Sequence, residues 1–497
     1  MQAYLLGIDI GTGSTKAVAV DLEGKSVGGS QHYYSVDSPQ PGYSEQDPEF
    51  IFKAFVNCVT DVVKTIGNSP IAISLSSAMH SVIPVDKNGD ALAPMITWAD
   101  SRSEDIAALI RNSEQGPDIY RTSGTPIHAM TPFCKIIWIK ENQAELFAAS
   151  YKFISIKEYI WHRLFNVFEV DYAIASATGL FDIIKLDWNA VACDLAGITK
   201  DQLSAPVNTT YKRADLSTSI AVMLTIDANT QFVIGASDGC CANLGSYVTE
   251  PGVASLTIGT SGAVRITSKQ PVYNYQSMIF NYLLNEKTFV CGGAINNGGI
   301  VLDWLFKTFS GKSSLTHADY GLLFEDIANI PAGSEGLIFL PYLYGERAPI
   351  WDTKSCGVFF NIKTQHTQSH FLRAGLEGIC FALNGVIESI EKSSPIERIH
   401  ISGGFISSPV WVQILADITQ KQLITIQQDD ASALGAIFLA DEALGINKLG
   451  KRPKMDNEVM VSPNKSNNQV YIDRFSVFKK LYQDLKETMH WMHENNQ

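Results

Sequence analysis

Two short turns rich in glycine, threonine and serine have the chemistry to bind phosphate. Gly11-Thr12-Gly13-Ser14-Thr15 interrupts an apolar stretch near the start of the chain, with Lys16 directly after it, and Gly259-Thr260-Ser261 interrupts a similar stretch half a chain later. Such turns expose backbone N–H groups, and glycine lets phosphate oxygens approach the backbone closely. Ordinary β-hairpins have the same pattern, so each turn alone leaves both interpretations open.

Two tripeptides resemble the familiar nucleotide-binding loop but lack its leading glycine. Gly24-Lys25-Ser26 and Gly311-Lys312-Ser313 carry the GKS sequence, whereas Ala19 and Phe306 stand where the motif needs glycine. The first glycine-threonine turn also lacks the third glycine of a dinucleotide-binding fingerprint. The sequence therefore supports neither a P-loop nor a Rossmann-type site.

Three aspartates are candidates for catalysis, metal binding or sugar binding. Asp9 ends the stretch before the first turn, where a carboxylate can reach a Mg²⁺ ion that bridges phosphates. Asp238, among small residues in GASDG, suits a general base that accepts a proton from a substrate hydroxyl during phosphoryl transfer. A helix N-cap is the structural alternative for Asp238. Asp100 in TWADSR could bind hydroxyls, although Trp98 and Arg102 beside it could equally form a surface stack.

Composition limits the classes of protein to which these residues can belong. The chain has 497 residues, 45% of them hydrophobic, and a net charge of −13. A globular protein of several domains is expected, and the negative charge argues against a general nucleic-acid or anionic-membrane binder while leaving an anionic small molecule open. Eight dispersed cysteines without a CxxC pair fit reduced thiols, and neither a secretory signal nor a spanning helix is expected. These features predict a cytoplasmic protein.

The elements that must position these residues fall into two similar halves. Ile10-Gly11-Thr12 and Ile258-Gly259-Thr260 are 258 − 10 = 248 residues apart, about half the chain. This spacing predicts an internal duplication, against the alternative of chance similarity. Between and after the turns, helical and strand patterns alternate, which indicates an α/β fold. Helices are predicted near residues 48–65, 157–165, 371–391, 410–420 and 473–494, and a β-like stretch near 170–183.

Nine segments resemble, in order, the motifs of the FGGY family of carbohydrate kinases. They cover almost the whole chain and read GIDIGTGSTKAV, SSAMHSVIPVD, ITWADSRS, KEYIWHRL, VIGASDG, TIGTSGA, YLYGERAPIWD, ISGGFISSPVWVQILADI and SALGAIFLA. The wording of SSAMHSVI, RTSGTPIHAMTP, DYAIASATG and INNGGIVL is more similar to the gluconate kinase members than to the xylulokinases. Xylulokinases usually read GQMHG where this chain has Ala78-Met79-His80-Ser81.

The resemblance implies a duplicated actin-like, ribonuclease H-like α/β fold with two domains around a central cleft. The expected divisions are residues 1–248, with the sugar site and first phosphate hairpin; 249–445, with the second hairpin and adenosine motif; and 446–497, a tail and helix packed on the second domain. It implies an ATP- and Mg²⁺-dependent enzyme with Asp238 as catalytic base and metal neighbour, and with Asp9 at the metal. The implied nucleotide residues, beyond the two hairpins and Lys16, are Gly299, Asp303, Gly404 and Ser408.

The same resemblance places Met79, His80, Trp98, Asp100 and Asp238 around the sugar. Gluconate carries a carboxylate, so its pocket should offer a cation or several well-aimed donors. The first-half candidates for this role are Arg102, Lys157, His80 and His128. Tyr172 and Asn297 are weaker candidates from the whole chain. A solvated helix face and a buried histidine are the structural alternatives for Lys157 and His80.

The predicted reaction is transfer of the ATP γ-phosphoryl group to the terminal hydroxyl of D-gluconate, which gives 6-phosphogluconate. Another FGGY substrate, such as xylulose or a related polyol, is the nearest alternative. An actin-like or chaperone-like ATPase and a catalytically silent sugar sensor are alternatives of other classes. The expected partner is a small sugar or sugar acid, with no nucleic acid or membrane; relatives are often dimers, which leaves a homodimer open.

Overall fold

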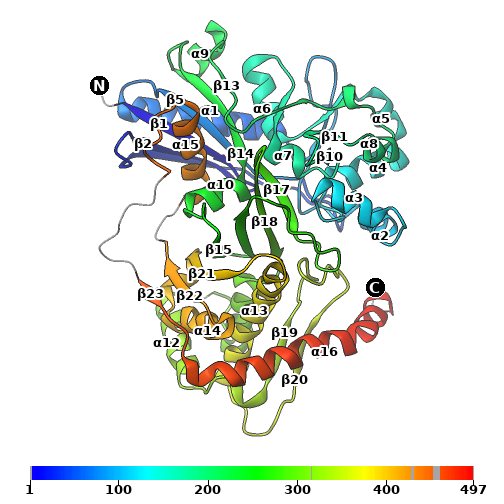
Figure 1. The fold of residues 1–497 in the computed structure, drawn as a ribbon, viewed down its shortest axis with the longest axis vertical. Coiled ribbons are helices and arrows are strands. Elements are labelled where there is room, and N and C mark those ends of the chain that lie inside the picture. The colour runs from blue at the N-terminus through cyan, green and yellow to red at the C-terminus, as the bar shows by residue number, and fades with distance from the viewer. Residues whose placement is uncertain (1–2, 315, 427–429, 451–458, 496–497) are drawn as a thin grey trace.

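Two mixed sheets, one from each half of the chain, form the centres of two lobes (Figure 1). The computed structural model describes residues 3–495 apart from 315, 427–429 and 451–458. In these residues the first sheet has six strands, in the order β13 (Lys212–Arg213), β14 (Gln231–Ser237), β5 (Ala72–Ser77), β1 (Tyr4–Ile10), β2 (Ser14–Asp21) and β3 (Ser26–Tyr33). The second has seven, in the order β17 (Phe280–Asn285), β18 (Thr288–Ile295), β16 (Gly262–Ser268), β15 (Gly252–Ile258), β21 (Ile396–Ser402), β22 (Gln422–Thr425) and β23 (Met460–Val461).

The two sheets have the same topology. In each, a β-hairpin (β1–β2 or β15–β16) is extended by an antiparallel strand on one side and by two parallel strands on the other. β1 and β15 begin at Tyr4 and Gly252, so the offset of 252 − 4 = 248 residues holds for the strands as well as for the turns. The predicted α/β class and internal duplication are confirmed by this match.

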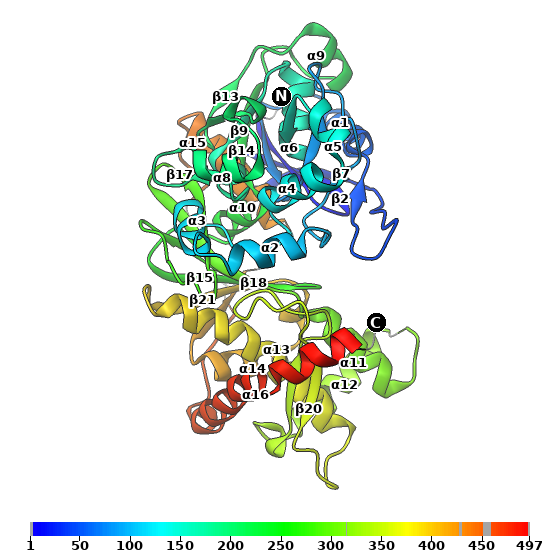
Figure 2. The same ribbon diagram turned by 90° about the vertical axis from the view of Figure 1, so that its right-hand side faces the viewer.

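Long helices cover the sheets where amphipathic patterns predict them. α1 (Pro48–Ile66) packs on β2 and β3, and α13 (Gln368–Glu391) packs on β16 and β18. α6 (Ile156–Phe165) and α14 (Pro409–Thr419) also lie close to the predicted ranges, and α11 (Gly299–Ser310) is a further helix of the second half. α16 (Asn468–Asn495) crosses the second lobe and contacts α13, α14 and β19 (Ile338–Pro341) (Figures 1 and 2). The part of the predicted tail at 451–458 lies outside the described residues.

One helix from the second half packs on the sheet of the first. α15 (Ala431–Ala443) lies against β1, β5 and β14, and it also packs along α10 (Asp238–Gly245) (Figure 1). A Cβ added to Gly435 would lie 1.9 Å from the carbonyl oxygen of Cys241, and one added to Gly7 would lie 2.2 Å from that of Ala433. Glycine is therefore required for these contacts, and they join the two halves directly.

The β-like interpretation of residues 170–183 was wrong in its middle. The structure has β9 (Glu169–Asp171), then the short helix α7 (Tyr172–Ser176), then β10 (Phe181–Asp182). Asp171 is the N-cap of α7, because its carboxylate accepts hydrogen bonds from the N–H groups of Ala173 and Ile174. A short apolar run is ambiguous in period, and the capping aspartate decides for the helix.

The remaining short elements belong mainly to the side of the first lobe and to the outer part of the second. They are β4 (Glu45–Gln46), β6 (Ile83–Val85), β7 (Met95–Ile96), α2 (Glu104–Arg111), α3 (Gly116–Ser123), α4 (Pro132–Asn142), α5 (Ala144–Ala149), β8 (Lys152–Ile154), β11 (Asp187–Trp188), α8 (Ala190–Ala196), β12 (Ala205–Val207), α9 (Thr218–Leu224), α12 (His317–Ala328) and β20 (Gly357–Phe360). Among the described residues, no helix has both the length and the apolar character needed to cross a bilayer.

Candidate active site

Asp9 and Asp238 lie at the carboxyl ends of two parallel strands of the first sheet. β1, β5 and β14 run parallel, and Asp9 pairs with Ser76 of β5 just before these strands end. Ligands of open α/β sheets commonly bind at this edge. The Ser76 hydroxyl donates to Asp9 Oδ1 at 2.7 Å, which orients the carboxylate. Burial and the nearby charge of Asp238 raise the pKa of Asp9 to about 6.

Asp238 is the first residue of α10, and Ser237 is the N-cap. The Ser237 side chain accepts from the N–H of Cys240, so the alternative of Asp238 as the N-cap is not what the structure shows. The Asp238 carboxylate accepts from the N–H of Gly239 at 2.7 Å and is half-buried at the wall of a cavity. Burial raises its pKa, while the positive charge of Arg265 opposes that rise.

A bulge in β14 directs the chain into this turn. The pairing of β14 with β5 shifts between Val233 and Ala236. Within this bulge Gly235 has φ +70°, and a Cβ added to it would lie 1.8 Å from the Leu75 carbonyl oxygen. No residue with a side chain fits there. Lys157 Nζ donates to the carbonyls of Ile234 and Ala236, at 3.1 and 2.8 Å, and therefore holds the bulge.

The two predicted hairpins and the adenosine motif border two adjoining cavities. The first, of about 1020 Å³, is lined by Asp9, Gly11, Thr12, Gly13, Ser14, Lys16, Ser402, Gly404, Ser407 and Asp430, among others. The second, of about 370 Å³, is lined by residues that include Gly259, Gly299, Asp303, Tyr320, Gly404, Phe405, Ser407, Ser408 and Trp411. Gly404 and Ser407 line both cavities, so the two spaces are continuous along the motif.

The lining of these two cavities differs in the way that the parts of a nucleotide differ. The larger one is bordered by glycine turns and polar groups, and Lys16 in it forms an ion pair with Asp430. The smaller one has the aromatic rings of Tyr320, Phe405 and Trp411 in its wall. Backbone amides of a glycine turn suit phosphates, and an apolar aromatic wall suits a base.

Two hairpin residues have other surroundings. Thr15 is fully buried, with its hydroxyl 3.3 Å from that of Tyr34. Thr260 is exposed at the tip of its hairpin, where its carbonyl accepts from the N–H of Ile300. Both residues support the turns through the backbone, and Ser261 of the second turn faces the third cavity described next.

The third cavity, of about 240 Å³, is lined by four of the sugar candidates, Met79, His80, Trp98 and Asp238, and lies between the two halves. Its wall is formed by Thr12, Met79, His80, Trp98, Met130, Asp238, Ser261, Gly262, Ala263, Arg265, Phe280, Tyr282, Ala294, Arg347 and Trp351. Thr12 also lines the phosphate-type cavity, and its hydroxyl accepts from Trp98 Nε1 at 2.8 Å. The three cavities therefore form one connected groove, with Asp238 in the part that adjoins the hairpins.

His80 joins the halves across this cavity as a neutral side chain. Its Nδ1–H donates to the carbonyl of Ala177 at 2.8 Å, and its Nε2 lies 3.2 Å from the hydroxyl of Tyr282 on β17. Burial and the charge of Lys135 lower the pKa of His80 to about 3. His80 Nε2 can therefore accept a hydrogen bond from a hydroxyl group, but the ring carries no charge at neutral pH.

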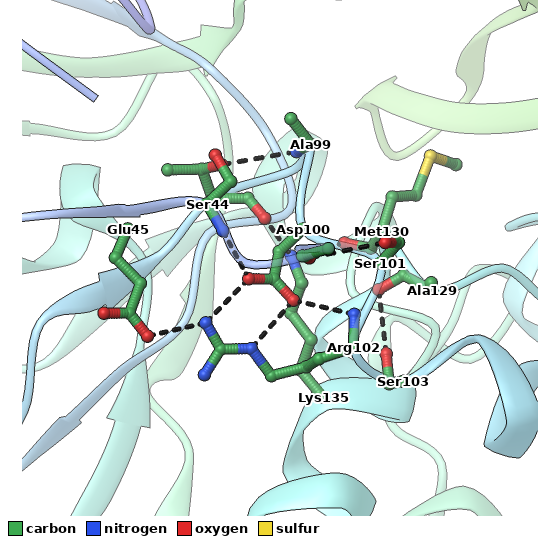
Figure 3. A network of polar contacts seen from close by, with 12 residues as sticks. Ser44, Glu45, Ala99, Asp100, Ser101, Arg102, Ser103, Ala129, Met130 and Lys135 are labelled. Atoms are coloured by element: carbon green, nitrogen blue, oxygen red, sulfur yellow. Dashed lines mark hydrogen bonds and ion pairs between the residues drawn. The ribbon is translucent and has the colours of Figure 1, made fainter. Parts of the chain in front are cut away.

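Asp100 and Arg102 lie beside the cavity wall and not in it. Arg102 donates from Nε and Nη2 to Asp100 at 2.8 and 2.7 Å and from Nη2 to Glu45 at 2.6 Å (Figure 3). Its guanidinium carbon is 3.7 Å from the centre of the Tyr43 ring. These contacts use the bidentate face of Arg102 and both oxygens of Asp100, so the two side chains bind each other and Glu45 outside the cavity lining.

The remaining candidates for binding a substrate carboxylate, Lys157, His128, Tyr172 and Asn297, also have other partners. Lys157 is buried and forms an ion pair of 2.7 Å with Asp171, in addition to its two bonds to the β14 bulge. Asn297 Nδ2 donates to the carbonyl of Gly345 and to Glu346, at 2.6 and 3.0 Å. His128 packs 5.3 Å from the Trp351 ring, and Tyr172 packs 6.0 Å from Phe181. None of these four side chains is in the lining of the third cavity.

The cations that do line the cavity come from the second half, which the search of the first half missed. Arg265 follows the second hairpin in TSGAVR, and Arg347 lies in YLYGERAPIWD. Met130, Phe280, Tyr282 and Trp351 were also not predicted. The alternation of β16 was an available signal for Arg265, because Ala263 and Arg265 are two residues apart and share a face.

A Mg²⁺ ion accompanying a nucleotide fits the acids of the groove. Mg²⁺ in such sites takes one or two carboxylates together with substrate phosphates and water. Burial and the charge of Asp238 raise the pKa of Asp9, and a bound cation would favour the ionised form of that carboxylate. Among the described residues no cluster of three or more acidic, histidine or cysteine ligands forms a complete protein-only metal site.

Comparison with known proteins agrees with this geometry. Two family models, for the N- and C-terminal domains of the FGGY family of carbohydrate kinases, match residues 4–245 and 254–443. The chain is 42% identical to a gluconokinase of Bacillus subtilis, over 90% of this chain and 88% of the relative. The crystal structure of a gluconate kinase from Lactobacillus acidophilus superposes with a TM-score of 0.91 at 33% identity, covering 98% of each chain.

A ligand-bound xylulose kinase from Lactobacillus acidophilus is equally similar in structure. Its TM-score is 0.91 at 33% identity, with 97% of this chain and 98% of that chain covered. The predicted duplicated actin-like fold is confirmed by these matches, which extend over both lobes. The chain therefore belongs to the FGGY family of carbohydrate kinases and is an ATP-dependent sugar kinase.

Proposed function

We propose that this kinase phosphorylates the terminal hydroxyl of D-gluconate and forms 6-phosphogluconate, with Mg·ATP as the phosphoryl donor. The observation that carries the choice of substrate is the 42% identity to a gluconokinase over 90% of the chain, which exceeds the 29% identity to a xylulose kinase of Lactococcus lactis. The connected groove supports the reaction type, because it offers space for a nucleotide on one side of Asp238 and for a sugar on the other.

Asp238 is the proposed catalytic base. Its carboxylate would accept the proton of the terminal hydroxyl as that oxygen bonds to the γ-phosphorus, while the bond from phosphorus to the bridging oxygen of ADP breaks. A pKa raised by burial brings a carboxylate closer to the range in which it is an effective base. The Gly239 N–H keeps one carboxylate oxygen fixed.

The two hairpins and Lys16 are the proposed phosphate ligands, and Asp9 with Asp238 would hold Mg²⁺. When bound, the metal supplies positive charge that offsets the charge on the phosphates. Most of the rate enhancement is expected from positioning and electrostatics. Closure of the two lobes over the groove would exclude water and so limit hydrolysis of ATP.

A xylulose or related polyol kinase is the second candidate, because the xylulose kinase structure is as similar as the gluconate kinase structure. The test is ADP release by the purified protein with ATP, Mg²⁺ and, in turn, D-gluconate, D-xylulose, D-ribulose and glycerol, and without any sugar. We expect the highest kcat/KM with gluconate. A preference for xylulose would overturn the proposed substrate, and ADP release that no sugar stimulates would favour an ATPase.

A further inference from the structure

Two arginines of the second half reach the sugar cavity, and neither is part of the catalytic arrangement described above. Arg265 is on β16, the strand that directly follows the turn Gly259-Thr260-Ser261, and Arg347 lies in the loop after β19. The acid in the cavity wall is Asp238. With Asp238 ionised, the charged groups of the wall carry a net charge of +1, although the chain as a whole carries −13.

Small residues leave room in front of Arg265. On β16, Ala263 shares its face, and on the neighbouring strand β18 the paired residues are Gly292 opposite Arg265 and Ala294 opposite Ala263. A Cβ on Gly292 would lie 2.1 Å from the Val264 carbonyl oxygen and 3.0 Å from the Phe280 ring, so glycine is required for the close approach of β18 to β16 and of that ring to both strands. The paired residues beside Arg265 on this face are therefore small.

Arg265 forms no hydrogen bond or salt bridge among the described residues, and it is half-buried. Its Nε lies 3.4 Å from where a Cβ on Gly239 would be, so the side chain runs beside the start of α10. Burial lowers the pKa of Arg265, and the charge of Asp238 in the same wall offsets that effect only in part. An anionic ligand in the cavity would therefore stabilise the guanidinium further.

Arg347 is held in place but keeps part of its guanidinium free. Nε donates to Asn296 Oδ1 at 2.7 Å and Nη2 to the carbonyl of Ile295 at 3.2 Å. Its guanidinium carbon lies 5.3 Å from the centre of the Trp98 ring. No hydrogen bond of Nη1 to another described residue is present. Both bonded partners are neutral, so the positive charge remains uncompensated by an ion pair.

Glu346, next to Arg347 in sequence, forms no salt bridge with either arginine, although its charge raises the pKa of Arg347 against the effect of burial. Glu346 accepts from the N–H groups of Asn296 and Arg347, at 2.5 and 2.8 Å, and from Asn297 Nδ2 at 3.0 Å. It is buried and outside the lining of the cavity. The two guanidinium groups therefore face the cavity as a positively charged pair.

We propose that Arg265 and Arg347 bind the carboxylate of the substrate and make this kinase select a sugar acid over a neutral polyol. The inference rests on the proposed function, since it names how the gluconate carboxylate is recognised. Arginine suits this role, because its planar fork donates two parallel hydrogen bonds to a carboxylate. The first half would then supply the base and the second half the anion site.

The test compares gluconate with glucitol, the neutral six-carbon polyol that lacks only the carboxylate. Dissociation constants of both are measured by calorimetry for the wild type, Arg265→Gln, Arg347→Gln and Arg265→Lys. We expect the glutamine variants to weaken gluconate binding by about 10- to 100-fold while glucitol changes by less than about twofold. Arg265→Lys keeps the charge without the fork and should lose less than Arg265→Gln.

Three outcomes would overturn the inference: wild type that binds gluconate no more tightly than glucitol, variants that weaken both ligands equally, or variants that weaken neither. If Arg265 instead sets the charge of Asp238, both ligands lose kcat together and the pH profile of kcat shifts. Melting temperatures show whether a variant folds, and the second arginine provides an independent variant. Wild-type turnover of gluconate separately tests the proposed function.

Discussion

The two halves of the molecule are built on one topology but carry different groups at matching positions. Asp9 is the second-last residue of β1, and Thr257, 257 − 9 = 248 residues later, is the second-last residue of β15. Each pairs with a serine on the adjacent parallel strand: Ser76 donates to Asp9 at 2.7 Å, and the hydroxyls of Thr257 and Ser402 lie 3.1 Å apart. The same strand edge is thus acidic in the first half and neutral in the second.

A similar exchange occurs elsewhere on the hairpins and helices. Val18 stands on β2 where Arg265 stands on β16, because they pair with Gly7 of β1 and Ser255 of β15, which are 248 residues apart. α10 begins with Asp238, whereas α15 begins with Ala431. Duplication therefore provides one scaffold that carries different groups in its two copies. Under the proposed function, acids of the first half would serve proton transfer and metal binding, and hydroxyls, glycines and cations of the second half would surround the nucleotide and sugar.

The largest expected effect on activity comes from neutralising Asp238, the proposed base of the first half. Asp238→Asn keeps the size of the side chain and its acceptor for the Gly239 N–H but removes the base. We expect kcat to fall by roughly 10²–10⁴-fold, the usual contribution of a general base, with the fold retained. The measurement is sugar-dependent ADP release, together with a melting curve.

Asp194→Asn on exposed α8 is the matched surface control, because only the backbone carbonyl of Asp194 accepts a hydrogen bond in the structure. It should leave both readouts unchanged. Wild-type-like turnover of Asp238→Asn would remove Asp238 from the role of base and leave the acidic edge of the first half without a catalytic explanation.

The contact between the halves is tested by a single methyl group. In Gly435→Ala the added Cβ would lie 1.9 Å from the carbonyl oxygen of Cys241, so α15 must move away from α10. We expect a loss of about 1–3 kcal/mol or more in the free energy of unfolding. The measurement is denaturant-induced unfolding, followed by circular dichroism.

Gly321→Ala in α12 is the matched control, since its Cβ would meet no atom within 4 Å. Alanine in a helix interior is favoured over glycine by about 0.5–1 kcal/mol, so this variant should be neutral or slightly stabilised. Equal stability of the two variants would mean that α10 and α15 do not pack as closely as the structure shows.

Much of this arrangement was readable from local patterns. The hairpins, the helices near α1, α13 and α14, and the strand–turn–helix around Asp238 follow from residue type and spacing within short windows. Side-chain partners at long range were not readable. Lys157 has the positive charge needed to bind an anionic substrate. Whether it contacts substrate or Asp171 depends on how α6 packs against β14, which local sequence does not show.

The cavity arginines illustrate the same limit. Arg265 faces the sugar cavity because Gly292 and Ala294 of β18 pair beside it, and that register is set only when the second sheet forms. Arg102, in contrast, lies next to Trp98 in sequence and yet is turned into a pair with Asp100. Proximity in sequence to a sugar motif was therefore a poor guide to which cation lines the site.

Lys135 offers a way to disturb one wall of the first half without touching its acids. It is fully buried on α4, and its Nζ donates to the carbonyls of His80 and Thr97, each at 2.6 Å, and of Met130 at 2.8 Å. Figure 3 shows Lys135 beside Asp100 and Met130. His80 and Met130 line the sugar cavity, and Thr97 precedes Trp98, which also does. Lys135 is thus a positioning residue for three segments.

Lys135→Met leaves three buried carbonyls without their donor. We expect KM for the sugar to rise by roughly tenfold or more, KM for ATP to change little, and stability to fall by about 1–3 kcal/mol. Steady-state kinetics with each substrate varied separately give the split. Lys140→Met, on an exposed position of the same helix, is the control and should match wild type. Equal rises in both KM values would indicate general damage rather than loss of the sugar wall.

The smallest expected effect is a pH-dependent change in melting temperature at Asp9, which its counterpart Thr257 should not show. The folded protein raises the pKa of Asp9 from 3.8 to about 6, so it holds that proton more tightly than the unfolded chain. The resulting stability is fully present below about pH 4 and is lost as the pH rises through 6. Without nucleotide and Mg²⁺, Asp9→Asn should therefore melt about 1–3 °C higher than wild type at pH 7.5 and equally at pH 4.

Thr257→Val at the matching position should show no such change between the two pH values, because threonine carries no titrating group. Mg·ATP should raise the melting temperature of wild type more than that of Asp9→Asn, since a ligand that binds the folded state stabilises it. A lower melting temperature of Asp9→Asn at pH 7.5 would mean that the charged carboxylate is favoured in the empty groove. Asp9 would then stabilise the folded protein, and its presence in the first half alone would not be a loss of stability that serves catalysis.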